Sequence, residues 1–175
     1  MTTISNINAL KSTLVEKLVT LYEDACLLSI KHECIIIAGG SALVLSDSIE
    51  RSTEDIDLLS TVTELEALIE TYNMNSRMQH YESNFPYHYK DRLRRIQINT
   101  TCLKFYIPSL EDLIVSKLYA LRPKDKEDLI HIMSDKKYNL ELLDKLVQEA
   151  KLSAINEHVY REMVQMYKRY FKEDE

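Results

Sequence analysis

The sequence predicts an α+β fold, in which helices pack on a small mixed β-sheet, a long helix precedes the sheet and the C-terminal third is helical. Three observations predict it. Apolar residues recur every three or four positions before residue 31 and after residue 109, as in amphipathic helices. The apolar, β-branched run CIIIA at 34–38 is typical of a buried strand. Two further runs, RLRRIQIN and CLKFYI, flank Thr100-Thr101 as the strands of a hairpin would.

The N-terminal helix is expected over residues 5–31, where the apolar positions are Ile7, Leu10, Leu14, Leu18, Leu21, Ala25 and Leu28. After the first strand, SALVL begins a short helix. The run DIDLLS at 55–60 alternates acidic and apolar residues, as a strand at the exposed end of a sheet does. A helix follows over 61–72, in which Thr63 and Glu66 have the spacing of a capping box. Residues 73–90 show no clear period and are expected to be loop or irregular strand.

The C-terminal third is expected to be four helices, at 109–121, 124–134, near 139–150 and at 153–171. Pro123 separates the first two, because proline cannot continue a helix that precedes it. The chain therefore divides into an αβ core with its N-terminal helix, residues 1–108, and a helical region, residues 109–175. We expect the helical region to pack on the core and to complete its functional site.

Composition limits the kinds of partner. The chain has 175 residues, of which 45% are hydrophobic and 29% charged, as in soluble globular proteins. A net charge of −6 argues against a broad nucleic-acid surface, so KDRLRR (90–95) and YKRYFK (167–172) are either local basic patches or solvated faces.

No apolar run is long enough to cross a bilayer and the N-terminus does not resemble a secretion signal, which predicts a cytoplasmic protein. The three cysteines form no CxxC, so we expect reduced thiols and neither a disulfide framework nor a zinc site.

The only two glycines are adjacent, at the end of the first predicted strand. Glycine accepts backbone angles closed to other residues and leaves room for an approaching ligand. Between a strand and a helix, Gly39-Gly40-Ser41 can present backbone N–H groups and a hydroxyl to an anion. The alternative is an ordinary strand-to-helix turn.

Two carboxylates, Asp55 and Asp57, follow the glycines. Residues two apart on a strand point to the same face, so the two side chains are expected to converge. Like charges held close together repel unless a cation lies beside them. Oxygen ligands suit Mg²⁺ or Mn²⁺, which binds through one or two carboxylates together with substrate phosphates. The alternative is an acidic strand end at the surface.

Lys117 falls within the apolar stripe of the predicted helix 109–121, three residues after Ile114. A charge on a core-facing stripe is costly unless it reaches an anion or water. A phosphate, Asp55 or Asp57 would satisfy it, and a lysine that reaches solvent along the edge of the stripe is the alternative. Farther along, Asp125 has the position of a helix cap, and Asp128 shares a helix face with apolar residues: Leu129 and Ile132.

Together these motifs resemble a known superfamily. The GGS turn followed by R-x-T-x-D-I-D, with fourteen residues between Gly40 and Asp55, resembles the nucleotidyltransferases typified by DNA polymerase β. The stretch YIPSLEDLIVSKLYALRPKDKEDLIHIM (106–133) resembles the lysine and R-x-K-D-x-x-D motifs of the abortive-infection type IV toxin nucleotidyltransferases and their small standalone relatives.

The resemblance implies a site and a reaction. Gly39, Gly40 and Ser41 would contact the nucleotide phosphates, Asp55 and Asp57 would hold Mg²⁺ or Mn²⁺, Lys117 would meet the nucleotide, and Asp125 with Asp128 would complete the site. The expected reaction moves NMP from a nucleoside triphosphate to an RNA acceptor, such as tRNA, or to a protein. A toxin–antitoxin pair, with an antitoxin protein as partner, is the further expectation.

One departure from the pattern keeps an alternative open. Active members of the superfamily bring a third carboxylate from a later strand, and neither RLRRIQIN nor CLKFYI contains an acid; Asp91 lies only at the edge of the first. The alternative is a catalytically inactive or regulatory nucleotide-binding module that acts through protein partners. A helical structural protein in which the motifs are coincidental is a third reading.

Overall fold

The structure is a computed structural model, and it describes residues 4–51, 53, 55–59, 63–153 and 156–172. It confirms the α+β class, with seven helices and a four-stranded mixed sheet among the described residues. The chain forms two compact units. Unit 1 comprises residues 1–82 and 93–108, and unit 2 comprises residues 83–92 and 109–175, so the segment 83–92 belongs with the C-terminal helices.

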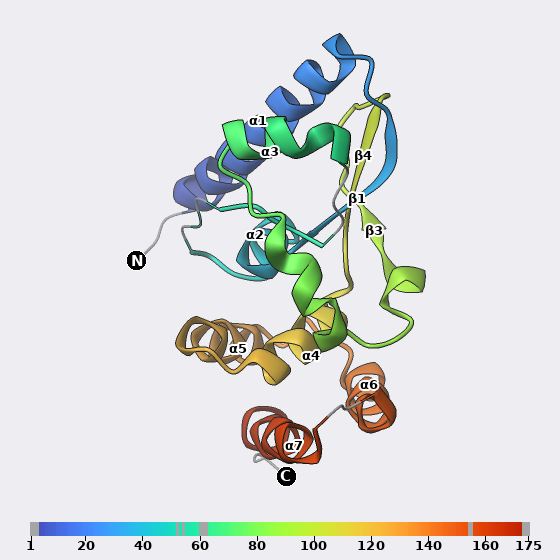
Figure 1. The fold of residues 1–175 in the computed structure, drawn as a ribbon. Helices are drawn as coiled ribbons and strands as arrows, with labels where there is room; N and C mark the ends of the chain where they lie inside the picture. The colour runs from blue at the N-terminus through green and yellow to red at the C-terminus, as the bar shows by residue number, and fades with distance from the viewer. Residues whose placement is uncertain (1–3, 52, 54, 60–62, 154–155, 173–175) are drawn as a thin grey trace. The chain divides into compact units, whose positions relative to one another are not determined.

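The sheet of unit 1 has the strand order β2-β1-β4-β3 (Figure 1). The central strand β1 (His32–Ala38) pairs parallel with β4 (Leu103–Ile107) and antiparallel with β2 (Asp57–Leu58). The edge strand β3 (Arg94–Arg95) pairs antiparallel with β4. The predicted hairpin pairing is therefore present, and its register, with Arg94 opposite Ile107, centres on Thr100-Thr101 as predicted. Hydrogen bonds from Ile98 N–H to the Ile96 carbonyl and from Thr100 N–H to the Ile98 carbonyl bend the chain through a longer connection.

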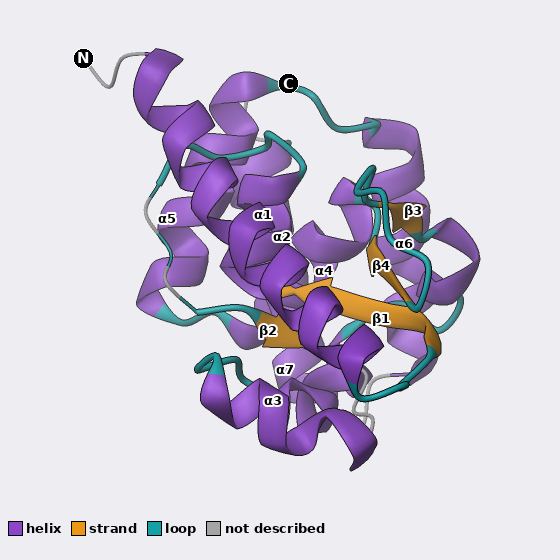
Figure 2. Cartoon of the chain, turned by 90° about the horizontal axis from the view of Figure 1, so that it is seen from above, coloured by secondary structure: helices purple, strands orange, loops and turns teal. Residues whose placement is uncertain are grey.

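Helices of unit 1 cover the strands, and their apolar faces are buried as predicted. Helix α1 (Ile4–Leu27) packs on α2 (Gly39–Leu45) and α3 (Glu66–Thr71), as Figures 1 and 2 show. The fully buried residues of α1 are Leu14, Leu18, Leu21 and Ala25. The helix ends before residue 31, because Ser29 takes a left-handed backbone conformation, φ 58°, and Leu28 is exposed.

Two local predictions in this unit are wrong. Residues Thr63–Leu65 form a 3₁₀ turn, and the cap of α3 is Leu65 without a side-chain hydrogen bond, so no capping box forms. The strand predicted over 55–60 is reduced to Asp57–Leu58; Asp55 precedes it, and Ser60 lies outside the described residues.

Cys26 and Cys102 form a disulfide with a Cα–Cα distance of 5.9 Å, so the prediction of reduced thiols is wrong for these two. The bond joins the end of α1 to the start of β4, two positions separated by 76 residues. Beside it, the hydroxyls of Tyr22 and Thr101 hydrogen-bond at 3.2 Å. Pairing of this kind depends on the tertiary fold and leaves no spacing motif in the sequence. Among the described residues, no helix has the length and apolar character to traverse a bilayer.

Unit 2 contains the four predicted C-terminal helices: α4 (Leu110–Ala120), α5 (Pro123–Asp135), α6 (Leu140–Ser153) and α7 (Glu157–Phe171). Their ends have local causes. The Ser109 hydroxyl accepts the Asp112 N–H and caps α4, and Leu121 in a left-handed conformation ends it. Asn156 caps α7 through the His158 N–H.

Residues 73–90 were predicted as loop or irregular strand. Two 3₁₀ segments, η2 (Arg77–Asn84) and η3 (Tyr89–Arg92), lie there instead, and the second extends two residues beyond that range.

Candidate functional site

The glycine turn lies where β1 ends and α2 begins, as predicted. Gly39 has φ +62°, a left-handed conformation that side chains with a Cβ rarely adopt. A Cβ added there would lie 2.2 Å from Oδ2 of Asp57. Glycine at position 39 is therefore required twice, once by the backbone angle and once because the Asp57 carboxylate lies against it.

Gly40 leaves room for a positive charge, whereas Gly39 leaves room for the negative charge of Asp57. A Cβ at this position would lie 2.4 Å from Nη2 and 3.1 Å from Cζ of Arg51, so the guanidinium group lies over Gly40. Arg51 is the first residue of the R-x-T-x-D-I-D motif, but it was not among the predicted site residues. The motif itself was the signal, because an arginine at a fixed distance from a phosphate-binding turn is suited to an anion.

Asp57 is held in place by its neighbours. It is half-buried at the start of β2, where its Cα pairs with that of Ala38 at the end of β1. The Asn75 side-chain amide donates to Oδ1 of Asp57 at 2.9 Å, and the two residues form a parallel bridge. Asn75 was not predicted, because a partner eighteen residues along the chain has no spacing signal. The hydrogen bond from Asn75 therefore orients the carboxylate, and the backbone bridge keeps Asn75 beside Asp57.

Asp55 has a different environment. It is exposed and precedes β2, and between the two aspartates Ile56 is fully buried. The alternation in DIDLLS thus appears locally even though the strand is short. Within the part of the chain that the structure describes, no group of three or more His, Cys, Asp or Glu side chains is arranged to hold a metal.

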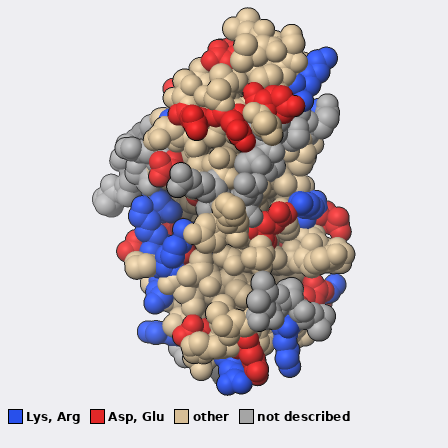
Figure 3. All heavy atoms as spheres, viewed as in Figure 1, with Lys and Arg blue, Asp and Glu red and all other residues tan. Residues whose placement is uncertain are grey.

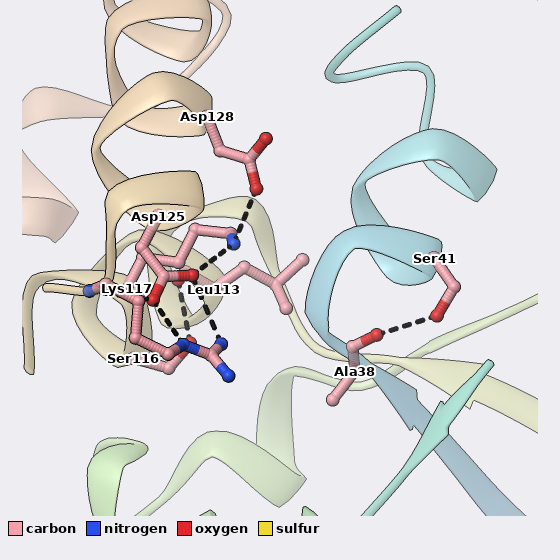
Figure 4. A network of polar contacts seen from close by, with 8 residues as sticks. Ala38, Ser41, Leu113, Ser116, Lys117, Asp125 and Asp128 are labelled. Atoms are coloured by element: carbon pink, nitrogen blue, oxygen red, sulfur yellow. Dashed lines mark hydrogen bonds and ion pairs between the residues drawn. The ribbon is translucent and has the colours of Figure 1, made fainter. Parts of the chain in front are cut away.

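Ser41 is fully buried, and its hydroxyl is used within the turn. It donates to the Ala38 carbonyl at 2.9 Å (Figure 4) and accepts from the Asp57 N–H at 3.4 Å. The hydroxyl therefore ties the end of β1 to the start of β2. The first N–H groups of a helix have no carbonyl one turn earlier, so the predicted phosphate contact of residues 39–41 would be made by backbone groups.

In unit 2, Lys117 of α4 lies between two aspartates of α5. Its Nζ is 2.9 Å from Oδ1 of Asp125 and 2.7 Å from Oδ2 of Asp128, and Figure 4 shows both carboxylates directed at the ammonium group. All three side chains are buried, with exposed fractions of 5%, 1% and 0%. The predicted need for an anion beside Lys117 is met by residues that were predicted to share its site, not by Asp55 or Asp57.

Asp125 has further donors. Its carboxylate accepts four hydrogen bonds, one from Lys117 and three from Arg122, of which one comes from the Arg122 backbone N–H. Burial alone would raise the pKa of Asp125, but the hydrogen bond from Arg122 and the charge of Lys117 together hold that pKa below its ordinary value. Asp125 thus helps to cap α5, but from the third helical position: the N-cap is Arg122, so the predicted N-cap position of Asp125 is wrong.

The two groups of residues lie in different units: the glycine turn, Arg51, Asp57 and Asn75 in unit 1, and the lysine group in unit 2. That they form one pocket stays a prediction. A hollow of about 450 Å³ lies elsewhere in unit 2, between α6 and α7, and none of the predicted site residues lines it.

In unit 1 the central strand ends in a glycine turn, and an aspartate of the adjacent antiparallel strand lies against the first glycine. This arrangement agrees with the class that the motifs resemble, the nucleotidyltransferase-like αβ proteins. The profile of a family described as nucleotidyltransferase of unknown function (DUF6036) matches residues 16–174, and the chain belongs to this family. The match includes every predicted site residue. No curated protein and no solved structure matches the chain. The narrower resemblance to abortive-infection toxins stays a prediction.

Proposed function

We propose that this protein is a metal-dependent transferase that moves NMP from a nucleoside triphosphate to an acceptor hydroxyl. The family supports nucleotidyl transfer in general. One observation supports the rest of the proposal. The carboxylate of Asp57 lies against Gly39, and the guanidinium of Arg51 lies against the next residue, Gly40. Asp57 supplies an oxygen ligand for a metal, and Arg51 supplies positive charge for phosphate.

The residues around Asp57 fit an Mg²⁺ or Mn²⁺ ion that binds together with the nucleotide phosphates. The donors are oxygens only, Asp57 is fixed by Asn75, and Asp55 is exposed two residues earlier. Two carboxylates without a third suit an ion that keeps several waters and arrives together with substrate phosphates. Bound there, the ion would neutralise phosphate charge and lower the pKa of the acceptor hydroxyl.

Within this proposal the chain's own residues have separate tasks. The backbone at residues 39–41 and the guanidinium of Arg51 bind the phosphates and stabilise the negative charge on the departing pyrophosphate. Asp57 would hold the metal ion, which would supply positive charge beside the phosphates. The resemblance assigns Lys117 to the nucleotide and Asp125 with Asp128 to the same site. In the structure the ammonium of Lys117 lies between these two buried carboxylates.

For the acceptor we propose an RNA, such as tRNA, or a protein, and for the biological role a toxin that an antitoxin protein neutralises. The second candidate is a regulatory nucleotide-binding module that does not transfer. One observation favours it: neither β3 nor β4 contains an acidic residue that could act as the third carboxylate on the sheet.

The test is incubation of the purified protein with each α-labelled nucleoside triphosphate and total RNA or cell protein, with Mg²⁺, Mn²⁺ or chelator. We expect a labelled acceptor that requires metal, is lost in Asp57→Asn and is kept in Glu64→Gln, a matched change of an exposed acid in unit 1. Metal-dependent binding of nucleotide without transfer would favour the regulatory module. Absence of binding for every nucleotide would contradict both candidates.

A further inference from the structure

The hollow of about 450 Å³ between α6 and α7 of unit 2 has an apolar lining. Its most buried lining residues are Val147 of α6 and Tyr167 of α7, at 4% and 5% exposure. Val164 and Tyr160 precede Tyr167 by one and two helical turns on the same face of α7, and both are half-buried. A mostly apolar hollow of this volume is typical of a site for one small molecule.

One carboxylate that lines the hollow ties the two helices together. Asp144 of α6 accepts hydrogen bonds from the Tyr167 hydroxyl at 2.5 Å and from Nζ of Lys172, the C-cap of α7, at 2.8 Å. The ring of Tyr167 also stacks on that of Phe171, with centroids 5.8 Å apart. Because these contacts hold α6 and α7 in place before a ligand arrives, binding loses little conformational entropy.

The charges that line the hollow leave a positive excess. Burial alone would raise the pKa of Asp144, but hydrogen bonds from Lys172 and Tyr167 hold that pKa below its ordinary value, so the carboxylate is ionised and paired with Lys172. The other charged lining residue is Lys168, which is exposed and has no acidic partner among the described residues. One acid against two lysines leaves one positive charge.

The positive charge belongs to the C-terminal part of α7, although the whole chain carries −6. From residue 163 to residue 172 the sequence contains two lysines and one arginine but no acid. Of the two readings that the sequence allows for YKRYFK (167–172), a basic patch and a solvated face, neither is complete: Tyr167 and Phe171 are buried, and Lys168 lies at the hollow. Acidic side chains gather instead over α3 in unit 1 (Figure 3). The charge at the hollow therefore favours an anion.

From the apolar lining, the fixed helices and the charge of Lys168, we propose that this hollow binds a small organic anion with a flat apolar body, such as an aromatic carboxylate or sulfonate. The body packs against the valines and the two tyrosine rings, which favour a flat partner, and the anionic group pairs with Lys168. An inorganic anion does not fit, because the valines would strip its water without replacing the hydrogen bonds. No residue of the proposed transfer lines the hollow, so this inference does not depend on that proposal.

The test is a fluorescence titration with anilinonaphthalene sulfonate, an aromatic sulfonate that becomes fluorescent when it leaves water, without nucleotide or metal. The matched probe is N-phenylnaphthylamine, which has the same rings and no sulfonate. We expect one saturable site that prefers the sulfonate. Lys168→Gln should weaken the sulfonate by about fivefold, as loss of one exposed ion pair does, and leave the neutral probe unchanged. Lys126→Gln, a change of an exposed lysine of α5, is the control and should affect neither probe.

A second variant fills the hollow. Val164→Phe should weaken both probes by about tenfold, because their apolar surface then stays in water. Val159→Phe is its control, since Val159 is a half-buried valine of the same helix that does not line the hollow. Circular dichroism shows whether each variant is folded, and the two lysine variants decide the question if Val164→Phe is not.

Several results would overturn the proposal: no saturable binding of the sulfonate, equal affinity of the wild type for the two probes, or equal losses in Lys168→Gln and Lys126→Gln. Displacement of the sulfonate by an equal concentration of inorganic phosphate would also overturn it, in favour of a plain anion site. The titration contains no nucleotide, so its failure leaves the proposed transfer untouched, and failure of nucleotide binding leaves this inference untouched.

Discussion

Replacing each glycine of the turn by alanine should distinguish the contribution of Asp57, which lies against Gly39, from that of Arg51, which lies against Gly40. In Gly39→Ala the backbone must keep φ near +62° with a Cβ present, which costs about 1–2 kcal/mol. The new Cβ also displaces Asp57, whose Oδ2 would lie 2.2 Å away on a short side chain. Reduced entropy of the unfolded chain offsets about 0.4–1 kcal/mol at most. We expect a clear loss of stability together with loss of metal-dependent nucleotide binding.

Gly40→Ala should behave differently. This position lies in α2 without a positive φ, and alanine is favoured over glycine in a helix by up to about 1 kcal/mol. The close contact is with the end of the long Arg51 side chain, which can rotate away. We expect stability within about 1 kcal/mol of the wild type and weaker nucleotide binding, because Arg51 no longer lies over the turn.

Urea denaturation followed by circular dichroism gives the stabilities, and calorimetry with nucleotide, with and without Mg²⁺, gives the affinities. Gly39→Asn is the control, since asparagine tolerates a left-handed backbone but still carries a Cβ. It should be more stable than Gly39→Ala and equally deficient in binding. A Gly39→Ala protein that is as stable as the wild type and binds nucleotide with metal would refute the contact between Asp57 and the turn.

Three further outcomes are expected. Lys117→Met removes the ammonium that two buried carboxylates share, and Arg122 still pairs with Asp125; the change should cost about 3–5 kcal/mol in urea denaturation, whereas a loss under 1 kcal/mol would contradict the buried group. Because the pKa of folded Asp125 lies below its ordinary 3.8, its stabilisation is complete above that pH and is lost as pH falls through the lower value; Asp125→Asn should flatten the acid limb of a stability–pH curve. Cys26→Ser should lower stability by about 2–4 kcal/mol under oxidising conditions only, and Cys34→Ser, which removes no disulfide, should not.

The elements that the sequence predicted well depend on local periodicity. The helices of unit 2 and the buried faces of α1 follow from the spacing of apolar residues, and β1 follows from its β-branched run. Ends and turns were predicted less well, because they depend on backbone hydrogen bonds that no side-chain pattern records. The missing capping box at Thr63 shows this, since the spacing was correct and the helix began at Glu66.

Contacts between distant segments were not predictable from one sequence. Asn75 reaches Asp57 through a bridge beside β2, and Cys26 reaches Cys102 because α1 and β4 are neighbours in the fold. Lys117 is intermediate: its place in an apolar stripe required an anion, but only the return of α5 along α4 selects Asp125 and Asp128. Sequence indicated the kind of partner there, and tertiary structure determined its identity.

The two glycines of this glycine-poor chain have a common explanation that does not require a ligand in contact with them. Each removes one Cβ that would otherwise collide with a charged side chain of the same unit, an acid at Gly39 and a base at Gly40. A turn needed only for chain reversal would require glycine at the left-handed position alone. The second glycine is needed because Arg51 lies over it, so the pair indicates that opposite charges are held side by side. That arrangement suits a substrate that brings both anionic phosphate and a cation, as a metal–nucleotide complex does.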